Sequence, residues 1–309
     1  MVWKEVNHAV NIRQKNTGIL LVAMSGACFG FIPLFTKMAY SGGTNTATLL
    51  FLRFFAGSLF LLLLIAIKKK PFPSRREILS YLLLGAGVYF GQSLCYFTAL
   101  KHTSSSVVAL LFYTYPAFVM AGSALFFKER ITPAKVLSLI LTLFGAFLIV
   151  GSEFQSTLLG ILLSLLCAII YSIYILISSR VVKPGMGLQS SAFIMLGVAL
   201  VYVILAAVTG FTFPSQVSGY TGIVLLAVIS TSMAFWSFFA GLEKVGPSTA
   251  SLVSVTEPVV VVISSVLFLS EPITLRTVIG GLLILSALFI ISIQEKRGSD
   301  QEVIEEGET

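Results

Sequence analysis

The chain has 309 residues, of which 57% are hydrophobic and only 11% are charged, with a formal net charge of +7. Soluble domains carry about 25% charged residues, so this composition excludes an ordinary soluble protein and indicates one embedded in lipid. The positive charge does not indicate nucleic-acid binding, because the basic residues fall in short loops between apolar runs, where they report membrane orientation.

The sequence contains no motif of an enzyme or a metal site. It has no Walker A sequence and no Gly-x-Ser-x-Gly nucleophile elbow, and its two histidines, His8 and His102, are too far apart for a His-x-x-x-His pair. Cys28, Cys95 and Cys167 fall inside apolar runs at unrelated spacings, which is typical of packing residues. We therefore expect no catalytic residue, metal or cofactor.

Ten apolar runs follow one another along the chain, each near the roughly 20 residues that a membrane-spanning helix needs. A polar segment, residues 1–16, precedes them, and an acidic tail that we expect to be disordered, residues 295–309, follows them. The sequence thus predicts an all-α integral membrane protein. The candidate spans are 17–38, 46–67, 78–99, 104–127, 132–150, 157–179, 188–209, 218–241, 247–269 and 273–294.

The distribution of lysine and arginine predicts how these spans are oriented. With a cytoplasmic N-terminus, sixteen of the 20 basic residues lie in cytoplasmic segments. Lys37, Lys101 and Arg276 lie outside, and Arg53 lies within a span. Because cytoplasmic loops carry an excess of lysine and arginine, we expect both termini in the cytoplasm and the protein in the plasma membrane.

The chain contains one unit twice. An offset of 142 residues places identical residues at thirteen positions of the stretch 96–135, including Thr114 on Thr256 and Pro116 on Pro258. The two units, residues 17–150 and residues 156–294, hold five spans each, and this odd number makes the second unit enter the bilayer upside down. Inverted repeats are typical of secondary transporters, which bind their substrate near the membrane midplane between the halves.

Polar side chains within the spans are the candidate binding groups. In the third span they follow the spacing i, i+3, i+4, i+7 of one helical face. Such a face forms either hydrogen bonds between packed helices or a cavity wall that offers rings and an amide to a ligand. We expect a substrate site formed by Tyr89, Gln92, Ser93, Tyr96, Tyr115, Tyr171, Trp236 and Glu257.

Arg53 and Glu257 are the formal charges that lie well inside the predicted spans. A charge at that depth costs about 2.5–3.5 kcal/mol on insertion scales, so it normally faces a protein interior or water. Both can be structural, they can form a buried charge pair, or Glu257 can be a protonatable coupling group. Helix bends, which either gate a cavity or simply pack, are expected at Pro33, Pro116 and Pro258.

With the repeat, the ten spans and these residues, the chain resembles the EamA-type members of the drug/metabolite transporter superfamily. The resemblance covers roughly residues 17–294 and is carried by Gly26–Lys37, by Arg53, and by two proline-to-glutamate blocks at 116–132 and 257–274. It implies ten transmembrane helices in two inverted five-helix repeats, with a central cavity lined mainly by spans one, three, four, six, eight and nine. It also implies export of amino acids, related metabolites or drugs, linked to protons or running down the solute gradient.

Two hypotheses of different classes follow. The first is a secondary transporter, more specifically an exporter, of a small organic solute such as an amino acid or related metabolite, working by alternating access between the repeats. The second is a non-transporting membrane sensor or assembly protein that keeps the fold. The expected partners are the solute, the lipid bilayer and, if transport is coupled, protons, with no nucleic acid. The sequence leaves a monomer and a homodimer both open.

Overall fold

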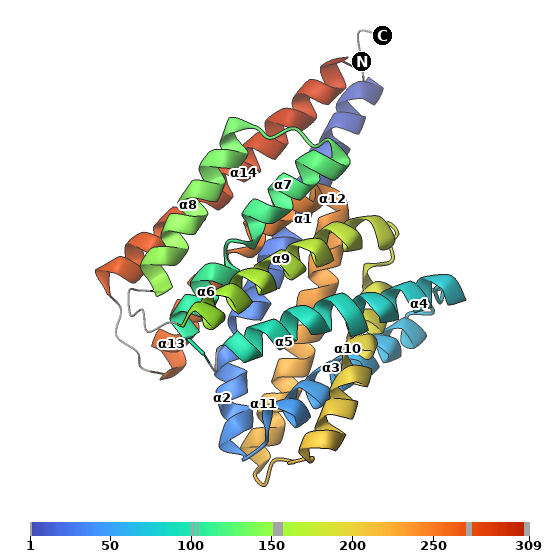
Figure 1. The fold of residues 1–309 in the computed structure, drawn as a ribbon. Coiled ribbons are helices and arrows are strands. Elements are labelled where there is room, and N and C mark those ends of the chain that lie inside the picture. Colours follow the sequence, from blue (N-terminus) through green and yellow to red (C-terminus); the bar gives the residue numbers. More distant parts are fainter. Residues whose placement is uncertain (1, 100–101, 104, 151–156, 270–273, 306–309) are drawn as a thin grey trace.

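The computed structural model describes residues 2–99, 102–103, 105–150, 157–269 and 274–305, and every regular element within these ranges is a helix (Figure 1). The first repeat comprises α1 (Val2–Gly30), α2 (Ile32–Ser41), α3 (Thr46–Ile67), α4 (Arg75–Leu83), the π-helix η1 (Leu84–Tyr89), α5 (Phe90–Ala99), α6 (Ser105–Phe112), α7 (Tyr115–Phe127) and α8 (Pro133–Val150). The second comprises α9 (Leu158–Val181), α10 (Gly187–Thr209), α11 (Val217–Ala227), the π-helix η2 (Val228–Met233), α12 (Ala234–Ser254), α13 (Glu257–Leu269) and α14 (Leu275–Glu305).

Eight helical stretches of the described chain are long and apolar enough to cross a membrane, whereas the sequence predicts ten spans. The predicted span 132–150 is the shorter apolar helix Pro133–Ile149. The predicted span 247–269 is divided, because its first part ends the long stretch Val217–Ser254 and its second part is the short helix Glu257–Phe268. The two predicted spans that differ are thus a helix shorter than a full span and a span that a helix break divides.

A turn at Gly246 divides α12 into two arms. Gly246 has φ 76° and ψ 170°, a conformation that is open to glycine but strained for residues with a Cβ. Pro247 follows directly and cannot donate the backbone N–H that would continue the first arm. The two residues thus turn the chain where the predicted spans 218–241 and 247–269 meet.

Both repeats contain a helix that is broken at the same place. The breaks at 113–114, between α6 and α7, and at 255–256, between α12 and α13, are separated by the 142-residue offset of the repeat. Pro116 and Pro258 each stand second in the new helix, where the missing N–H costs no intrahelical bond. Pro33 holds the same place in α2, after the break at Phe31.

Each repeat also contains a π-helix that packs against the other repeat. η1 contacts α10, and η2 contacts α3. A π-helix adds one residue to a helical turn and often marks a functional position. The backbones of η1 and α10 come so close together that a Cβ on Gly85 would overlap the carbonyl of Ile194.

Glycines let α1 pack directly onto the second broken helix. A Cβ on Gly26 would overlap the Thr256 hydroxyl, and one on Gly30 would lie 2.6 Å from Val260 Cβ. The Gly-x-x-x-Gly spacing in the first span thus permits close helix contact, as such spacings commonly do. As a result, α1 is held against the break that precedes Glu257.

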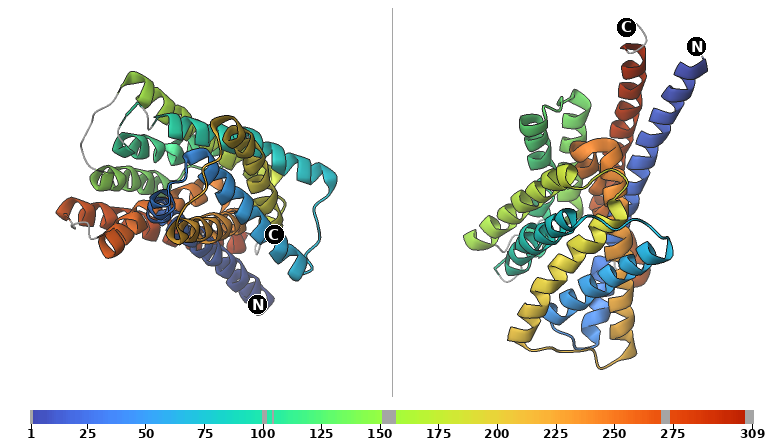
Figure 2. Two further views of the ribbon diagram at one scale, coloured as in Figure 1. Left: turned by 90° about the horizontal axis from the view of Figure 1, so that it is seen from below. Right: turned by 90° about the vertical axis from the view of Figure 1, so that its right-hand side faces the viewer.

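Both chain ends lie at one end of the bundle, where α1 and α14 project (Figures 1 and 2). α1 begins at Val2, so most of the polar N-terminal segment is helical. The last helix does not stop at the end of its apolar run, because α14 continues to Glu305. The expectation of a disordered acidic tail is therefore wrong up to that residue, since the tail is helical there. The second proline-to-glutamate block runs from 257 to 274. Its residues 270–273 lie outside the described ranges.

Candidate functional site

A cavity of about 530 Å³ lies among helices of both repeats. Most of its walls are aromatic rings and branched aliphatic side chains, interrupted by a few polar groups, which is the usual composition of a small-molecule site. The predicted site residues that line it are Pro33, Arg53, Tyr89, Gln92, Ser93, Tyr96, Tyr115, Tyr171, Glu257 and Pro258.

Two residues of the predicted site lie elsewhere. Trp236, on α12, is 37% exposed and borders a smaller pocket together with Lys68 and Gln189. Pro116 is buried at the start of α7 and does not line the cavity. The sequence pattern does not indicate which side of the bundle Trp236 faces. The packing of α12 directs its side chain away from the cavity.

The set of spans around the cavity also differs from the set that the family resemblance implies. The eighth span, 218–241, contributes no lining residue among those described. Spans two, five and ten do contribute, through Arg53, Ile149 and Thr277. The eighth span acts one layer behind the wall, since its π-helix η2 holds Arg53.

The polar face of the third span both packs against other helices and faces the cavity. Ser93 Oγ and Tyr202 Oη share a hydrogen bond of 2.6 Å, and Gln92 Nε2 donates to Cys167 Sγ at 3.3 Å. Gln92 and Ser93 still line the cavity together with Tyr89 and Tyr96. The interhelical bonds fix the face in place, so the two alternatives drawn from the sequence coexist in the structure.

An aromatic wall surrounds the middle of the cavity. The ring centroids of Tyr115 and Tyr171 are 4.9 Å apart, and those of Phe112 and Tyr171 are 5.2 Å apart. Tyr96 meets Phe112 edge to face at 5.8 Å. Aromatic pairs at these separations stabilise one another, so this wall is a pre-formed surface for an apolar or aromatic group.

Arg53 is the cation among the described residues that line the cavity, and the second repeat holds it. Its Nε donates to Thr231 Oγ1 at 2.7 Å and its Nη2 donates to the Ser230 carbonyl at 3.3 Å. The side chain is only 7% exposed. Since a guanidinium has five N–H donors and two are used here, three remain for a ligand.

The sequence carries no local signal that connects Arg53 to these partners. Ser230 and Thr231 stand out in the sequence as part of a run of hydroxyl residues in the eighth span. Thr231 is 178 positions away from Arg53, however, and no local pattern links the two. A polar run facing a buried arginine is recognised only once α3 and η2 are seen to pack together.

Glu257 is the carboxylate of the cavity and the first residue of α13, directly after the helix break. Among the described residues it forms no ion pair with Arg53 or with any other cation within 4.0 Å. The N-terminus of a helix favours a negative charge, so the carboxylate has local support without a salt bridge. The charge pair considered from the sequence is therefore not formed in this structure.

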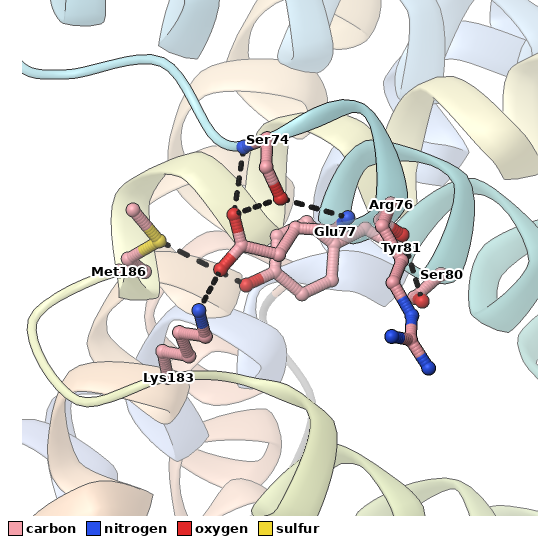
Figure 3. Close-up of polar contacts among 7 residues, drawn as sticks. All are labelled: Ser74, Arg76, Glu77, Ser80, Tyr81, Lys183 and Met186. Atoms are coloured by element: carbon pink, nitrogen blue, oxygen red, sulfur yellow. Dashed lines mark hydrogen bonds and ion pairs between the residues drawn. The ribbon is translucent and has the colours of Figure 1, made fainter.

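Polar contacts join the two repeats at the end of the bundle that carries the chain ends. Lys183 Nζ lies 2.6 Å from Glu77 Oε1, and the N–H and hydroxyl of Ser74 both donate to Glu77 Oε2 (Figure 3). The bond to Glu77 raises the pKa of Lys183. A second contact between the repeats is the bond that Ser248 Oγ donates to Glu129 Oε2 at 2.8 Å. These contacts close the connecting loops of one repeat onto the other.

The cavity reaches toward the opposite end of the bundle. Its lining includes Ile149 near the last residue of α8, Val266 near the end of α13, and Thr277 near the start of α14. Glu257 and Tyr115 lie deeper, at the two helix breaks. The two ends of the bundle thus differ. Polar contacts join the repeats at the end that carries the chain ends, and the cavity reaches toward the other end.

If the polar face of the third span meets water in the cavity, single cysteines at Gln92 and Tyr96 should react with small water-soluble thiol reagents. Cysteines at Leu83 and Leu94, which are 61% and 47% exposed on the outer surface, should react much more slowly in lipid because the reagent does not enter hydrocarbon. The measurement is the labelling rate in membranes, with the native cysteines replaced. Equal rates at all four positions would contradict a water-filled cavity.

Comparison with known proteins identifies a family model, several relatives and a solved structure that are similar to this chain. The model of the "EamA-like transporter family" matches residues 16–151 and again residues 158–293. "Uncharacterized transporter YcbK" of Bacillus subtilis (strain 168) is 26% identical over 87% of this chain and 90% of that protein. An "Uncharacterized transporter" of Archaeoglobus fulgidus is 26% identical over 94% of this chain and 98% of that protein. One crystal structure shares the fold, with a TM-score of 0.79 and 20% identity over 90% of this chain and 98% of the other.

Proposed function

The chain belongs to the EamA-like transporter family, and on that premise we propose that it is a secondary exporter of a small organic solute, such as an amino acid or related metabolite. The solute crosses the plasma membrane by alternating access between two inverted five-helix repeats, which together span the membrane ten times. Both chain ends are cytoplasmic. Export is the direction that the family resemblance implies.

The observation that carries the proposal is that Arg53 and Glu257 present opposite charges to one cavity without pairing to each other. A free amino acid carries a carboxylate and an ammonium group on one carbon. The free N–H groups of Arg53 suit the carboxylate, and the Glu257 carboxylate suits the ammonium. The aromatic wall of Tyr96, Phe112 and Tyr171 then contacts the side chain of the solute.

The repeat supports alternating access. Helix breaks at 113–114 and 255–256, and π-helices that begin at Leu84 and Val228, within two residues of the same offset, give the two repeats similar potential bends. In transporters with inverted repeats, discontinuous helices near the midplane form the substrate site, and the two halves move about it. In this state the loops near Glu77 and Glu129 are joined across the repeats, and opening toward the cytoplasm requires that these contacts separate.

Purified protein in liposomes tests the proposal directly. Amino acids and related metabolites are first ranked by thermal stabilisation, because a ligand at 100 times its Kd stabilises the folded state by about 2.7 kcal/mol. The stabilising solutes are then followed as flux into and out of the liposomes. A solute that stabilises the protein but shows no flux above protein-free liposomes would favour the non-transporting sensor instead.

The proposed topology predicts which loops face the cell exterior. Cysteines placed at Ser41 and Gln216 should react with an impermeant thiol reagent added outside intact cells, whereas cysteines at Phe72 and Pro184 should react only after the membrane is permeabilised. All four positions are exposed in the structure, so local burial does not bias the result. The reverse pattern at both pairs would place the chain ends outside and overturn the proposed direction of the cavity.

A further inference from the structure

We propose that η2 positions Arg53: Thr231, assisted by the Ser230 carbonyl, fixes the guanidinium so that its free edge faces the cavity and selects solutes that carry a carboxylate. The inference rests on the proposed function, since it assigns a specificity to the same cavity. Thr231 does not line the cavity. It acts through Arg53 and is therefore a positioning residue.

The π-helix makes Thr231 a dedicated acceptor for Arg53. Its hydroxyl donates to the carbonyl of Leu226, five residues earlier, at 2.8 Å. A hydroxyl has one proton to donate and two lone pairs, so its donor is used and its lone pairs remain for the Arg53 Nε–H. The chain of bonds from Arg53 through Thr231 to Leu226 also sets the rotamer of Thr231, which fixes the direction of the guanidinium.

The edge of Arg53 that η2 holds determines the edge that is left free. Nε and Nη2 both point toward η2, where they donate to Thr231 and Ser230. The Nη1 group and the second N–H of Nη2 form the other edge of the planar group. Two parallel N–H bonds from such an edge match the two oxygens of a carboxylate, whereas a single acceptor uses only one of them.

The first repeat shows that helix packing does not require these hydroxyls. η1 packs on α10 as η2 packs on α3, yet η1 contains neither serine nor threonine. At the 142-residue offset, Met195 is the counterpart of Arg53 in the second repeat. Gly85 of η1 lies close to the backbone of the adjacent residue, Ile194. Of the two π-helices, only the one that meets the arginine contains serine and threonine, which favours a role for these side chains in holding the charge.

Two neighbours of Thr231 provide matched controls. Ser232 Oγ makes the same bond to a carbonyl five residues earlier, at 2.8 Å, and also donates to the Gly57 carbonyl of α3, but among the described residues the hydrogen bonds of Arg53 go to Thr231 and Ser230. Ser230 contacts Arg53 only through its backbone, and its own hydroxyl is buried with no hydrogen-bond partner among the described residues. Ser232→Ala removes an equivalent structural bond, and Ser230→Ala leaves the contact to Arg53 in place.

The test compares three probes that differ in their charged groups: L-phenylalanine, 3-phenylpropionate, which lacks the ammonium, and 2-phenylethylamine, which lacks the carboxylate. Thr231→Val should weaken binding of both carboxylates about tenfold and leave the amine within twofold. Thr231→Ser should restore binding, while Ser232→Ala and Ser230→Ala should leave the ratio of carboxylate to amine affinity unchanged. Equal weakening of all three probes by Thr231→Val would overturn the proposed specificity.

A second readout does not depend on the solute. In protein labelled with ¹⁵N-arginine, the Nε–H signal that disappears in Arg53→Lys reports the bond to Thr231. Its hydrogen exchange should be at least about tenfold faster in Thr231→Val than in wild type or Ser232→Ala, and unchanged exchange would overturn the positioning role. If wild type binds none of the three probes, the proposed amino-acid function fails, and the exchange rates alone decide whether Thr231 holds Arg53.

Discussion

Replacement of Glu257 by glutamine should abolish the response of transport to a proton gradient while leaving folded protein in the membrane. Glutamine has the size and neutrality of the protonated acid, and Glu257 makes no ion pair among the described residues that the change would break. If Glu257 exchanges a proton for the solute, an outside-acid gradient should accelerate export in wild type. One pH unit supplies about 1.4 kcal/mol per coupled proton, a tenfold change in accumulation.

The measurement is efflux of a stabilising solute from proteoliposomes with and without an outside-acid gradient, normalised to folded protein. Glu243→Gln is the matched control, because Glu243 accepts a bond from the Gly185 N–H outside the cavity and should leave the pH response intact. If Glu257→Gln folds normally and keeps the wild-type response, Glu257 is a structural residue at the start of α13 and is not the coupling group.

Loss of the guanidinium should have the largest effect on binding. Arg53→Met should weaken binding of carboxylate solutes by at least about a hundredfold, because a hydrogen bond to a charged group contributes about 1.5–3 kcal/mol, two such bonds are lost, and each 1.4 kcal/mol is a factor of ten. The protein should still fold, since the Thr231 hydroxyl keeps its bond to Leu226 and methionine fills a similar volume. Met195, at the equivalent position of the second repeat, is fully buried in the same fold.

Affinity is measured by isothermal titration or by thermal stabilisation with L-phenylalanine, and folding by the melting profile without ligand. Arg53→Lys is the informative intermediate, because it keeps the positive charge but lacks the planar fork, so binding should fall between wild type and Arg53→Met. Retention of phenylalanine affinity within threefold in a folded Arg53→Met protein would show that Arg53 does not bind the carboxylate.

The sequence alone indicated most of the polar residues of the cavity wall because the signals are local. The spacing of Tyr89, Gln92, Ser93 and Tyr96 follows directly from 3.6 residues per turn, and a carboxylate beside Pro258 is costly in lipid unless it faces an interior. The 142-residue repeat likewise needs no coordinates, and it anticipated that the breaks before Pro116 and Pro258 would correspond. Composition was sufficient to predict helices in a membrane, since lipid leaves backbone groups no other partners within a single segment.

Only the tertiary structure decided which side chains meet. It turned Trp236 away from the cavity and placed Thr231 beside Arg53, because both depend on how helices distant in sequence rotate against one another. Among the described residues it also left Glu257 without a salt bridge, although Arg53 and Glu257 line one cavity, since α3 and α13 are fixed by their own packing. Hydropathy measures how apolar a segment is, whereas the contacts of a buried polar group are set by helix packing, which a single segment does not encode.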